Sequence, residues 1–268
     1  MFINDLRNRG RYLVLVTIFV CFCNFNANAT SLMPHDLFTK VLSKHVSEGR
    51  INFTDLCKDE GLNQYIEKLN TIDPQSMAQE KERFAFWLNV YNAYSLWAIC
   101  KRYPIKSIND LNFGGLIVSV VLKKSVWDKP FVMVNHKPYT LRQVDHEILR
   151  PTFKDPRIQF AIACGAVGCA ASRSEAYEAN LIEEQLDDQA RKFINNPKLN
   201  HFNKDARMAE LSPLFNWSRK LFGKDEREVL LYISAYLPQD LRKDIIENTS
   251  SWKINYNKYD LTINDTVK

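Results

Sequence analysis

A short cysteine-containing segment, residues 164–169 (CGAVGC), has the composition of a nucleophilic site. It follows residues 158–162, whose alternating apolar side chains predict a strand that ends at Cys164. A cysteine at the end of a strand, followed by glycine, would expose its sulfur. Backbone N–H groups around Gly165 would lower the pKa of the thiol and stabilise an oxyanion. The pattern makes Cys164 a candidate nucleophile and Gly165 an oxyanion-binding position.

Three other interpretations of this segment stay open. A Cys164–Cys169 disulfide would close a six-residue loop, which an oxidising compartment favours and tight geometry limits. Thiol redox chemistry between the same cysteines fits less well, because C-x4-C is not the C-x-x-C motif of thioredoxin-like proteins. A metal site fits least, since this is not a zinc spacing and no second Cys or His pair stands nearby. We predict neither a metal nor a cofactor.

His146 is the candidate general base. It is flanked by Asp145 and Glu147 and followed by Arg150. Imidazole is the usual general base near neutral pH, although a single histidine on a helix is more often structural or exposed. Arg150, together with Arg173, would be able to pair with a carboxylate of a ligand.

Two asparagines lie in a helix that the sequence predicts to be buried on all sides. Residues 84–100 (FAFWLNVYNAYSLWAIC) contain no formal charge, and a helix that is apolar all round is a core helix. Asn89 and Asn92 are three residues apart and so share a face of it. A buried amide without a partner costs about 1–3 kcal/mol. Each amide must therefore tie the helix to neighbouring loops, line a pocket or orient a catalytic group.

The surrounding pattern predicts a helix-rich α+β domain around a small β-sheet. Capping-box patterns open two of the expected helices, at Ser76 with Gln79 and at Thr140 with Gln143. We expect helices at residues 33–48, 62–69, 76–102, 140–150, 178–195, 211–222 and 229–237, a β-hairpin at 131–139 and a connector at 103–130. No repeat or domain boundary is evident, so residues 30–268 are expected to form a single globular domain.

Residues 1–29 have the three parts of a cleavable signal peptide: a basic start, an apolar run of about fourteen residues, and Ala27-Asn28-Ala29. That run is shorter than the roughly 20 residues needed to span a bilayer, so we expect no membrane span after cleavage. Removing the segment takes away three arginines and one aspartate, which changes the formal net charge from +5 to +3. These interspersed charges give no reason to expect a nucleic-acid partner. We expect a periplasmic protein, with full secretion as the alternative.

Seven segments together resemble the domain of unknown function 547 family. They are RFAFWLNVYNAY (83–94), YPIKSIND (103–110), VDHEILRP (144–151), RIQFAIACGAVGC (157–169), SEAY (174–177), LSPLFNWSRKLFG (211–223) and YDLTIND (259–265). The likeness covers most of residues 80–265. It implies functional positions at Asn89, Tyr91, Asn92, His146, Arg150, Cys164 and Gly165. Relatives often have proline where this chain has Ala170, and some have serine at Cys169, which weakens a required disulfide and favours Cys164.

The preferred hypothesis is an exported cysteine-dependent hydrolase or acyl transferase, with a site geometry like that of a cysteine protease. Cys164 would be the nucleophile and His146 its base, oriented by Asn89, Asn92 or a nearby carboxylate, with the oxyanion held near Gly165. The alternative is a non-catalytic binding or scaffold module, in which the Asn, His, Cys and Arg groups form a buried polar network. The partner would be a small molecule or a peptide of unknown identity.

Overall fold

The computed structural model describes residues 35–112 and 125–267. They belong to one compact unit, Met33–Lys268. The predicted signal peptide, residues 1–29, lies outside the described residues. The apolar stretch 116–122 of the expected connector lies outside them as well.

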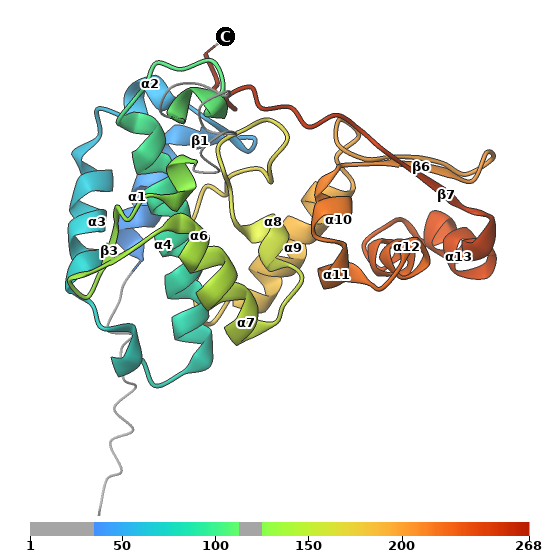
Figure 1. Ribbon diagram of the computed structural model, residues 1–268, viewed down its shortest axis with the longest axis horizontal. Coiled ribbons are helices and arrows are strands. Elements are labelled where there is room, and N and C mark those ends of the chain that lie inside the picture. Colours follow the sequence, from blue (N-terminus) through green and yellow to red (C-terminus); the bar gives the residue numbers. More distant parts are fainter. Residues whose placement is uncertain (1–34, 113–124, 268) are drawn as a thin grey trace, which may run out of the picture. The chain divides into compact units, whose positions relative to one another are not determined.

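Helices make up most of the described chain, which confirms the helix-rich α+β class (Figure 1). The α-helices are α1 (Asp36–His45), α2 (Phe53–Leu56), α3 (Glu60–Thr71), α4 (Glu80–Cys100), α6 (Leu141–Gln143), α7 (Arg150–Phe153), α8 (Ile158–Ala161), α9 (Ile182–Ile194), α10 (Leu214–Trp217), α11 (Arg219–Phe222), α12 (Glu226–Ser234) and α13 (Gln239–Asn248). Single turns of other helix types are η1 (Pro74–Ser76), η2 (Ile108–Leu111), η3 (Val126–Asp128), the π-helical η4 (Val144–Leu149) and η5 (Thr249–Ser251).

The strands form three small sheets instead of the single one expected. Antiparallel pairs join β1 (Val46–Ser47) to β2 (Arg50–Ile51) and β3 (Val132–Val134) to β4 (Lys137–Tyr139); β6 (Met208–Leu211) lies between antiparallel β5 (His201–Asn203) and parallel β7 (Lys253–Tyr256). The predicted hairpin at 131–139 is confirmed. Asn135 and His136 both have positive φ at its turn, which suits the twist of the flanking strands.

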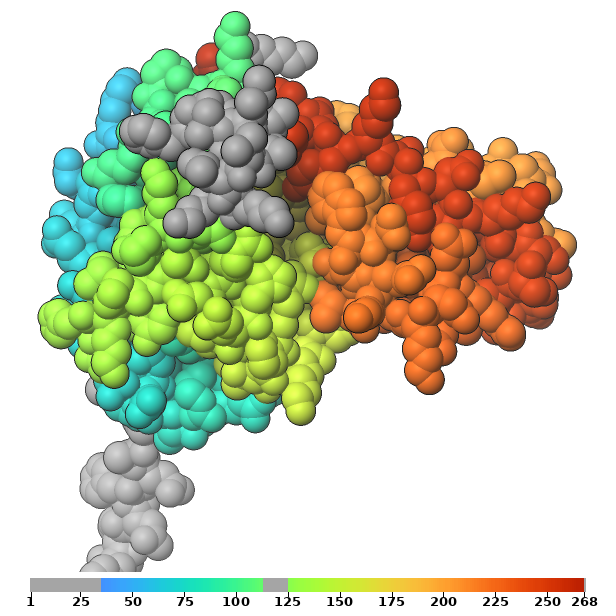
Figure 2. All heavy atoms as spheres, viewed as in Figure 1, coloured from blue at the N-terminus to red at the C-terminus, as the bar shows by residue number. Residues whose placement is uncertain are grey.

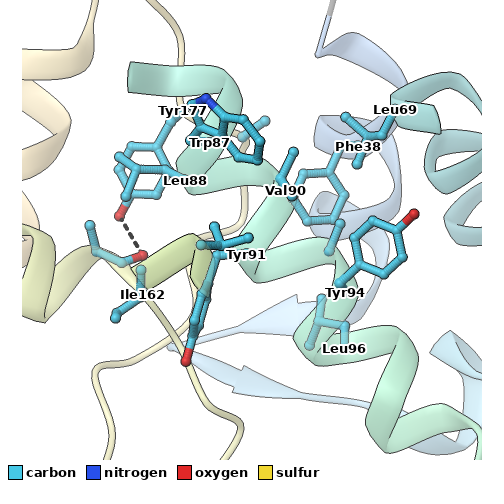
Figure 3. Close-up of a cluster of buried hydrophobic side chains, with 14 of the residues drawn as sticks. Phe38, Leu69, Trp87, Leu88, Val90, Tyr91, Tyr94, Leu96, Ile162 and Tyr177 are labelled. Carbon is cyan, nitrogen blue, oxygen red and sulfur yellow. Dashed lines mark hydrogen bonds between the residues drawn. The ribbon is translucent and has the colours of Figure 1, made fainter. Parts of the chain in front are cut away.

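Helix α4 is the core helix that its charge-free sequence predicts. Its residues from Phe84 to Ile99 are buried, except Asn92 and Trp97, which are partly buried. Side chains of α1 and α3 pack against it (Figure 3). Its N-cap is Gln79 with Glu82, so the prediction of Ser76 as the cap is wrong. Ser76 instead bonds to the carbonyl of Asp73 in the preceding turn. No helix within the described residues is both long and apolar enough to cross a membrane.

Helix α8 contributes side chains to two hydrophobic clusters. It lies where a strand was predicted at 158–164, so that prediction is wrong. Ile158, Ala161 and Ile162 pack into the cluster around α4, whereas Phe160 packs into a second cluster. In that second cluster Phe160 stacks on Phe193 of α9 at 4.9 Å between ring centroids. Apolar residues that alternate along the sequence here reflect a short helix buried on both sides, which periodicity alone does not separate from a strand.

Several other predicted elements differ at their ends. The helix expected at 211–222 begins only at Leu214, because Leu211 belongs to β6. It is also interrupted at Ser218, which separates α10 from α11. The helix expected at 140–150 has the predicted Thr140 capping box and then widens into the π-turn η4 before α7. Strands β5 to β7 and helix α13 were not predicted.

Candidate functional site

An open cleft of about 320 Å³ lies between α10–α11 and the segment η4–α7 (Figure 2). One wall carries His146 and Arg150, and the opposite wall consists of residues 216–221. Two of the predicted site residues therefore lie in the same cleft, next to a wall that the sequence hypothesis did not include.

A buried ion pair supports the His146 wall. The Arg150 guanidinium donates to both carboxylate oxygens of Asp145, at 2.6 and 3.1 Å, and also to Gln159 Oε1 at 3.0 Å. Ser218 Oγ donates to the same Gln159 oxygen at 2.7 Å. These bonds connect the two walls through α8. Arg150 is thereby neutralised by the protein itself, so its role is to position the cleft and not to supply a free charge.

His146 stands at the rim of the cleft. Its side chain is 56% exposed, and its Nε2 lies 3.6 Å from Asp145 Oδ2. Within the described residues no hydrogen bond joins His146 to Cys164, Asn89 or Asn92. Asp145 is the one carboxylate that pairs with this imidazole in the part of the chain that the structure describes.

The opposite wall presents an aromatic ring and two cations to solvent. Trp217 is 63% exposed, although its ring also contacts Tyr259 at 5.1 Å between centroids. Arg219 and Lys220 follow it and are both exposed. Neither forms an ion pair with another described residue. This wall therefore offers an aromatic face next to two positive charges.

A Cys164–Cys169 disulfide contacts the hydroxyl of Tyr259, and the ring of Tyr259 contacts Trp217. The Tyr259 hydroxyl donates to Cys169 Sγ at 3.1 Å and lies 3.4 Å from Cys164 Sγ. The backbone N–H of Cys164 also donates to Cys169 Sγ, at 3.2 Å. Burial raises the pKa of Tyr259, which keeps its hydroxyl protonated as a donor. With its sulfur in the disulfide, Cys164 carries no thiol.

Four backbone N–H groups of the loop around Gly165 donate to other groups of the protein. Those of Val167, Gly168 and Cys169 donate to carbonyls at 2.8–3.1 Å, and that of Cys164 donates to sulfur. Gly165 has a φ of +81°, and a Cβ there would lie 2.3 Å from Ile99 Cδ1. Close packing in a left-handed conformation explains this glycine. None of those four N–H groups points to a free oxyanion.

Tyr91 connects the core helix to the same polar region. Its hydroxyl points away from the apolar cluster in which its ring is buried (Figure 3). Burial raises its pKa, and the nearby Asp145 carboxylate and Tyr259 hydroxyl raise it further against the opposing effect of Arg150. Tyr91 therefore stays neutral at physiological pH and lies close to the residues behind the cleft.

The two asparagines bind backbone groups elsewhere in the core. Asn89 donates to the carbonyl of Tyr177 at 2.8 Å and accepts from its N–H at 2.9 Å. Asn92 donates to the carbonyl of Ala161 at 3.0 Å and accepts from the N–H of Ala163 at 2.8 Å. Both amides are fully engaged in the way that a core network requires. They line an internal cavity of about 20 Å³, and His146 does not.

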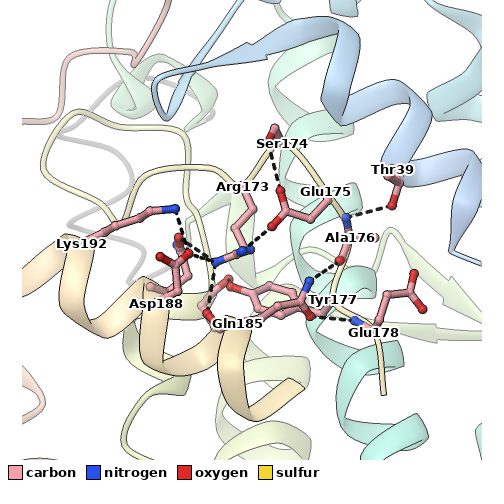
Figure 4. A network of polar contacts seen from close by, with 12 residues as sticks. Thr39, Arg173, Ser174, Glu175, Ala176, Tyr177, Glu178, Gln185, Asp188 and Lys192 are labelled. Carbon is pink, nitrogen blue, oxygen red and sulfur yellow. Dashed lines mark hydrogen bonds and ion pairs between the residues drawn. The ribbon is translucent and has the colours of Figure 1, made fainter. Parts of the chain in front are cut away.

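Arg173 lies at that internal cavity as well, apart from Arg150. Figure 4 shows its guanidinium between Glu175 and Asp188, with the Asp188 oxygen at 2.5 Å. It also donates to the carbonyl of Gln185 at 3.1 Å. The structure thus separates the predicted residues into a cleft group (His146 and Arg150, with Tyr91 behind) and an internal group (Asn89, Asn92 and Arg173).

Four residues at this site were not predicted from the sequence: Trp217, Arg219, Lys220 and Tyr259. The signal was present, because exposed tryptophan and two basic residues sit within NWSRKLFG, one of the segments that carries the family resemblance. Among the described residues, no group of three or more His, Cys, Asp or Glu side chains is placed to hold a metal ion.

Residues 74–194 match the model of a family described as "Protein of unknown function, DUF547". No match was found among curated proteins or among solved structures. The matched region contains the His146 wall, the disulfide and both asparagines, and it ends before the Trp217 wall.

Proposed function

We propose that the DUF547 domain, which this chain carries at residues 74–194, forms with residues 216–221 a binding site for a small anionic ligand that has a flat apolar face. The observation that carries the proposal is the exposed Trp217 beside the unpaired Arg219 and Lys220 in a cleft. An aromatic face packs against a ring, and guanidinium and ammonium groups bind carboxylate or phosphate. The function is therefore that of a binding module.

The internal network supports a binding role because it makes the scaffold rigid. Arg150, Asp145 and Gln159 satisfy one another, and Gln159 also holds Ser218 of the opposite wall. Side chains fixed in this way lose little freedom when a ligand binds, which favours affinity. The bridging contacts place the cleft between two elements whose separation is set by hydrogen bonds.

Isothermal titration with glucuronate, glucose 6-phosphate and glucose tests the proposal, since the three probes share a ring and differ in charge. We expect both anions to bind and glucose to bind much more weakly. Trp217→Ala should weaken anion binding about tenfold or more. Lys220→Ala should weaken it by about 2- to 5-fold, and added salt should weaken it as well.

Lys198→Ala is the matched control, because Lys198 is an exposed lysine outside the cleft. Its affinity for the anions should equal that of the wild type. Equal binding of glucose and glucuronate, or unchanged anion binding by Trp217→Ala, would contradict the proposal.

The second candidate function is the cysteine-dependent hydrolase or acyl transferase. The observation in its favour is that Tyr259 contacts both Cys164 and Trp217, so the sulfur lies near the cleft that His146 lines. This candidate needs the reduced protein. It predicts that iodoacetamide labels reduced Cys164 with a midpoint well below pH 8.5, and that His146→Ala raises the midpoint. An unchanged midpoint in His146→Ala would reject it.

We also propose that the chain is exported to the periplasm with cleavage after Ala29. The tripartite pattern of residues 1–29 supports this, and so do two disulfides, Cys57–Cys100 and Cys164–Cys169, because disulfides persist in oxidising compartments. Mass spectrometry of the periplasmic fraction should find Thr30 as the N-terminus, and Ala29→Asp should block cleavage. Recovery of intact Met1 protein in the cytoplasm would contradict export.

A further inference from the structure

We propose that the Cys164–Cys169 disulfide is an exchangeable redox site that oxidises an external dithiol, with Cys164 as the sulfur that is attacked. This activity is separate from ligand binding in the cleft. It rests on three features of the disulfide: the unequal burial of its two sulfurs, the hydrogen bonds that Cys169 accepts, and the contrast with the other disulfide of the chain.

The two cysteines differ in their access to solvent. Cys169 is buried, with 8% of its surface exposed, whereas Cys164 is partly exposed. An incoming thiolate must approach a disulfide sulfur directly, so access decides which sulfur reacts. Because Cys164 is the more accessible of the two residues, we assign it as the attacked sulfur and Cys169 as the leaving group.

The protein stabilises negative charge on the leaving sulfur. Cys169 Sγ accepts from the Cys164 N–H at 3.2 Å and from the Tyr259 hydroxyl at 3.1 Å. Donors that face a sulfur lower the pKa of the thiol it becomes, and a thiol with a lower pKa leaves faster. Because burial raises the pKa of Tyr259, its hydroxyl keeps the proton that it donates.

The Cys57–Cys100 disulfide lacks this arrangement and serves as an internal reference. Within the described residues, no side-chain hydroxyl or backbone N–H donates to either of its sulfurs. It links residues 43 apart in the sequence, whereas Cys164 and Cys169 are 5 apart. Since loop-closure stabilisation grows with loop length, the short disulfide contributes less as a staple and can open at a smaller cost in stability.

The exchange proceeds in two balanced steps. A substrate thiolate attacks Cys164 Sγ, which forms a mixed disulfide and releases Cys169 as a thiolate held by its two donors. The second thiolate of the substrate then attacks the first substrate sulfur, which is bonded to Cys164 in the mixed disulfide. This forms the disulfide of the substrate and releases Cys164 as a thiolate. The substrate loses two electrons and two protons and becomes a disulfide, while Cys164 and Cys169 gain them and become thiols.

The test treats the oxidised, folded protein with dithiothreitol, alkylates at timed intervals and quantifies each cysteine by mass spectrometry. We expect Cys164–Cys169 to be reduced at least about ten times faster than Cys57–Cys100. With glutathione as the thiol, the adduct should lie on Cys164 and the free thiol on Cys169. Equal rates, reduction only after unfolding, or an adduct on Cys169 would each overturn the proposal.

Two tyrosine variants test the role of the hydroxyl. Tyr259→Phe should slow reduction of Cys164–Cys169 by about 3- to 10-fold, because the leaving thiolate loses a charge-assisted bond. Tyr256→Phe is the matched control, since the Tyr256 hydroxyl is buried without a hydrogen-bond partner among the described residues. It should leave the rate unchanged. No slowing in Tyr259→Phe would overturn the assigned role of the leaving group.

Discussion

Replacement of Asn89 by alanine lowers the free energy of unfolding by about 3–5 kcal/mol. The side chain is completely buried, and its amide satisfies both the N–H and the carbonyl of Tyr177. Alanine leaves both backbone groups in the core without a partner, and each such group costs about 1–3 kcal/mol. Urea unfolding followed by circular dichroism measures the change, which should shift the midpoint at constant slope.

Asn195→Ala is the control that isolates burial. The Asn195 amide also donates to two backbone carbonyls, those of Arg191 and Tyr236, but at an exposed position. Water can replace it there, so the loss should stay below about 1 kcal/mol. If Asn89→Ala were as mild as Asn195→Ala, Asn89 would not be the anchor that the structure indicates.

Replacement of Arg150 by methionine destabilises the fold by about 3–5 kcal/mol. The change removes the guanidinium that neutralises the buried Asp145 carboxylate and donates to Gln159. An uncompensated buried charge is costly, whereas the methionine chain still fills the space of the arginine stem. Thermal and urea unfolding should both register the loss. Anion binding should weaken as well, because Gln159, which accepts from Ser218, loses the Arg150 bond that holds it in place.

The double variant Asp145→Asn with Arg150→Met distinguishes charge from packing. Removing the carboxylate charge should restore a large part of the stability, giving a coupling free energy of about 2 kcal/mol or more. Arg142→Met is a surface reference, because Arg142 pairs with Asp128 and is half exposed. That change should cost about 1 kcal/mol or less. Additive single effects at Asp145 and Arg150 would contradict a buried ion pair.

The sequence predicted best where one physical effect dominates. A charge-free stretch of seventeen residues that follows charged ones favours a core helix over a membrane span, and α4 is a core helix. The hairpin at 131–139 and the Thr140 capping box depend on local turn and cap chemistry, which neighbouring residues determine. Asn89 and Asn92 were expected to need partners, and the structure provides them from the backbone.

The elements that were not predicted from the sequence are those that depend on tertiary packing. Residues 158–162 alternate like a strand, yet residues 158–161 form α8, and two separate clusters bury its side chains. Strand β6 pairs with β7, which lies more than forty residues later in the sequence, and no local signal encodes that parallel register. Likewise, the distance along the chain between His146 and Trp217 hid the second wall of the cleft.

Grouping by residue type also misplaced part of the candidate site. Cys, His, Asn and Arg side chains were expected in one constellation, but the asparagines and Arg173 surround an internal cavity while His146 and Arg150 line the cleft. The reason is that these residues come from different elements. The asparagines lie on α4 and Arg173 lies in the loop before α9, whereas His146 lies on η4 and Arg150 begins α7. A helical spacing of three residues placed both asparagines correctly on one face without revealing which partners that face meets.

The most direct test of a ligand site at the Trp217 wall is nuclear magnetic resonance of the indole N–H groups of the five tryptophans during titration with glucuronate. Trp217→Phe assigns the Trp217 signal. We expect a saturable shift of that signal with glucuronate and glucose 6-phosphate, little shift with glucose, and small changes at the other four tryptophans. Unmoved Trp217, or larger shifts at another tryptophan, would show that the cleft is not the binding site.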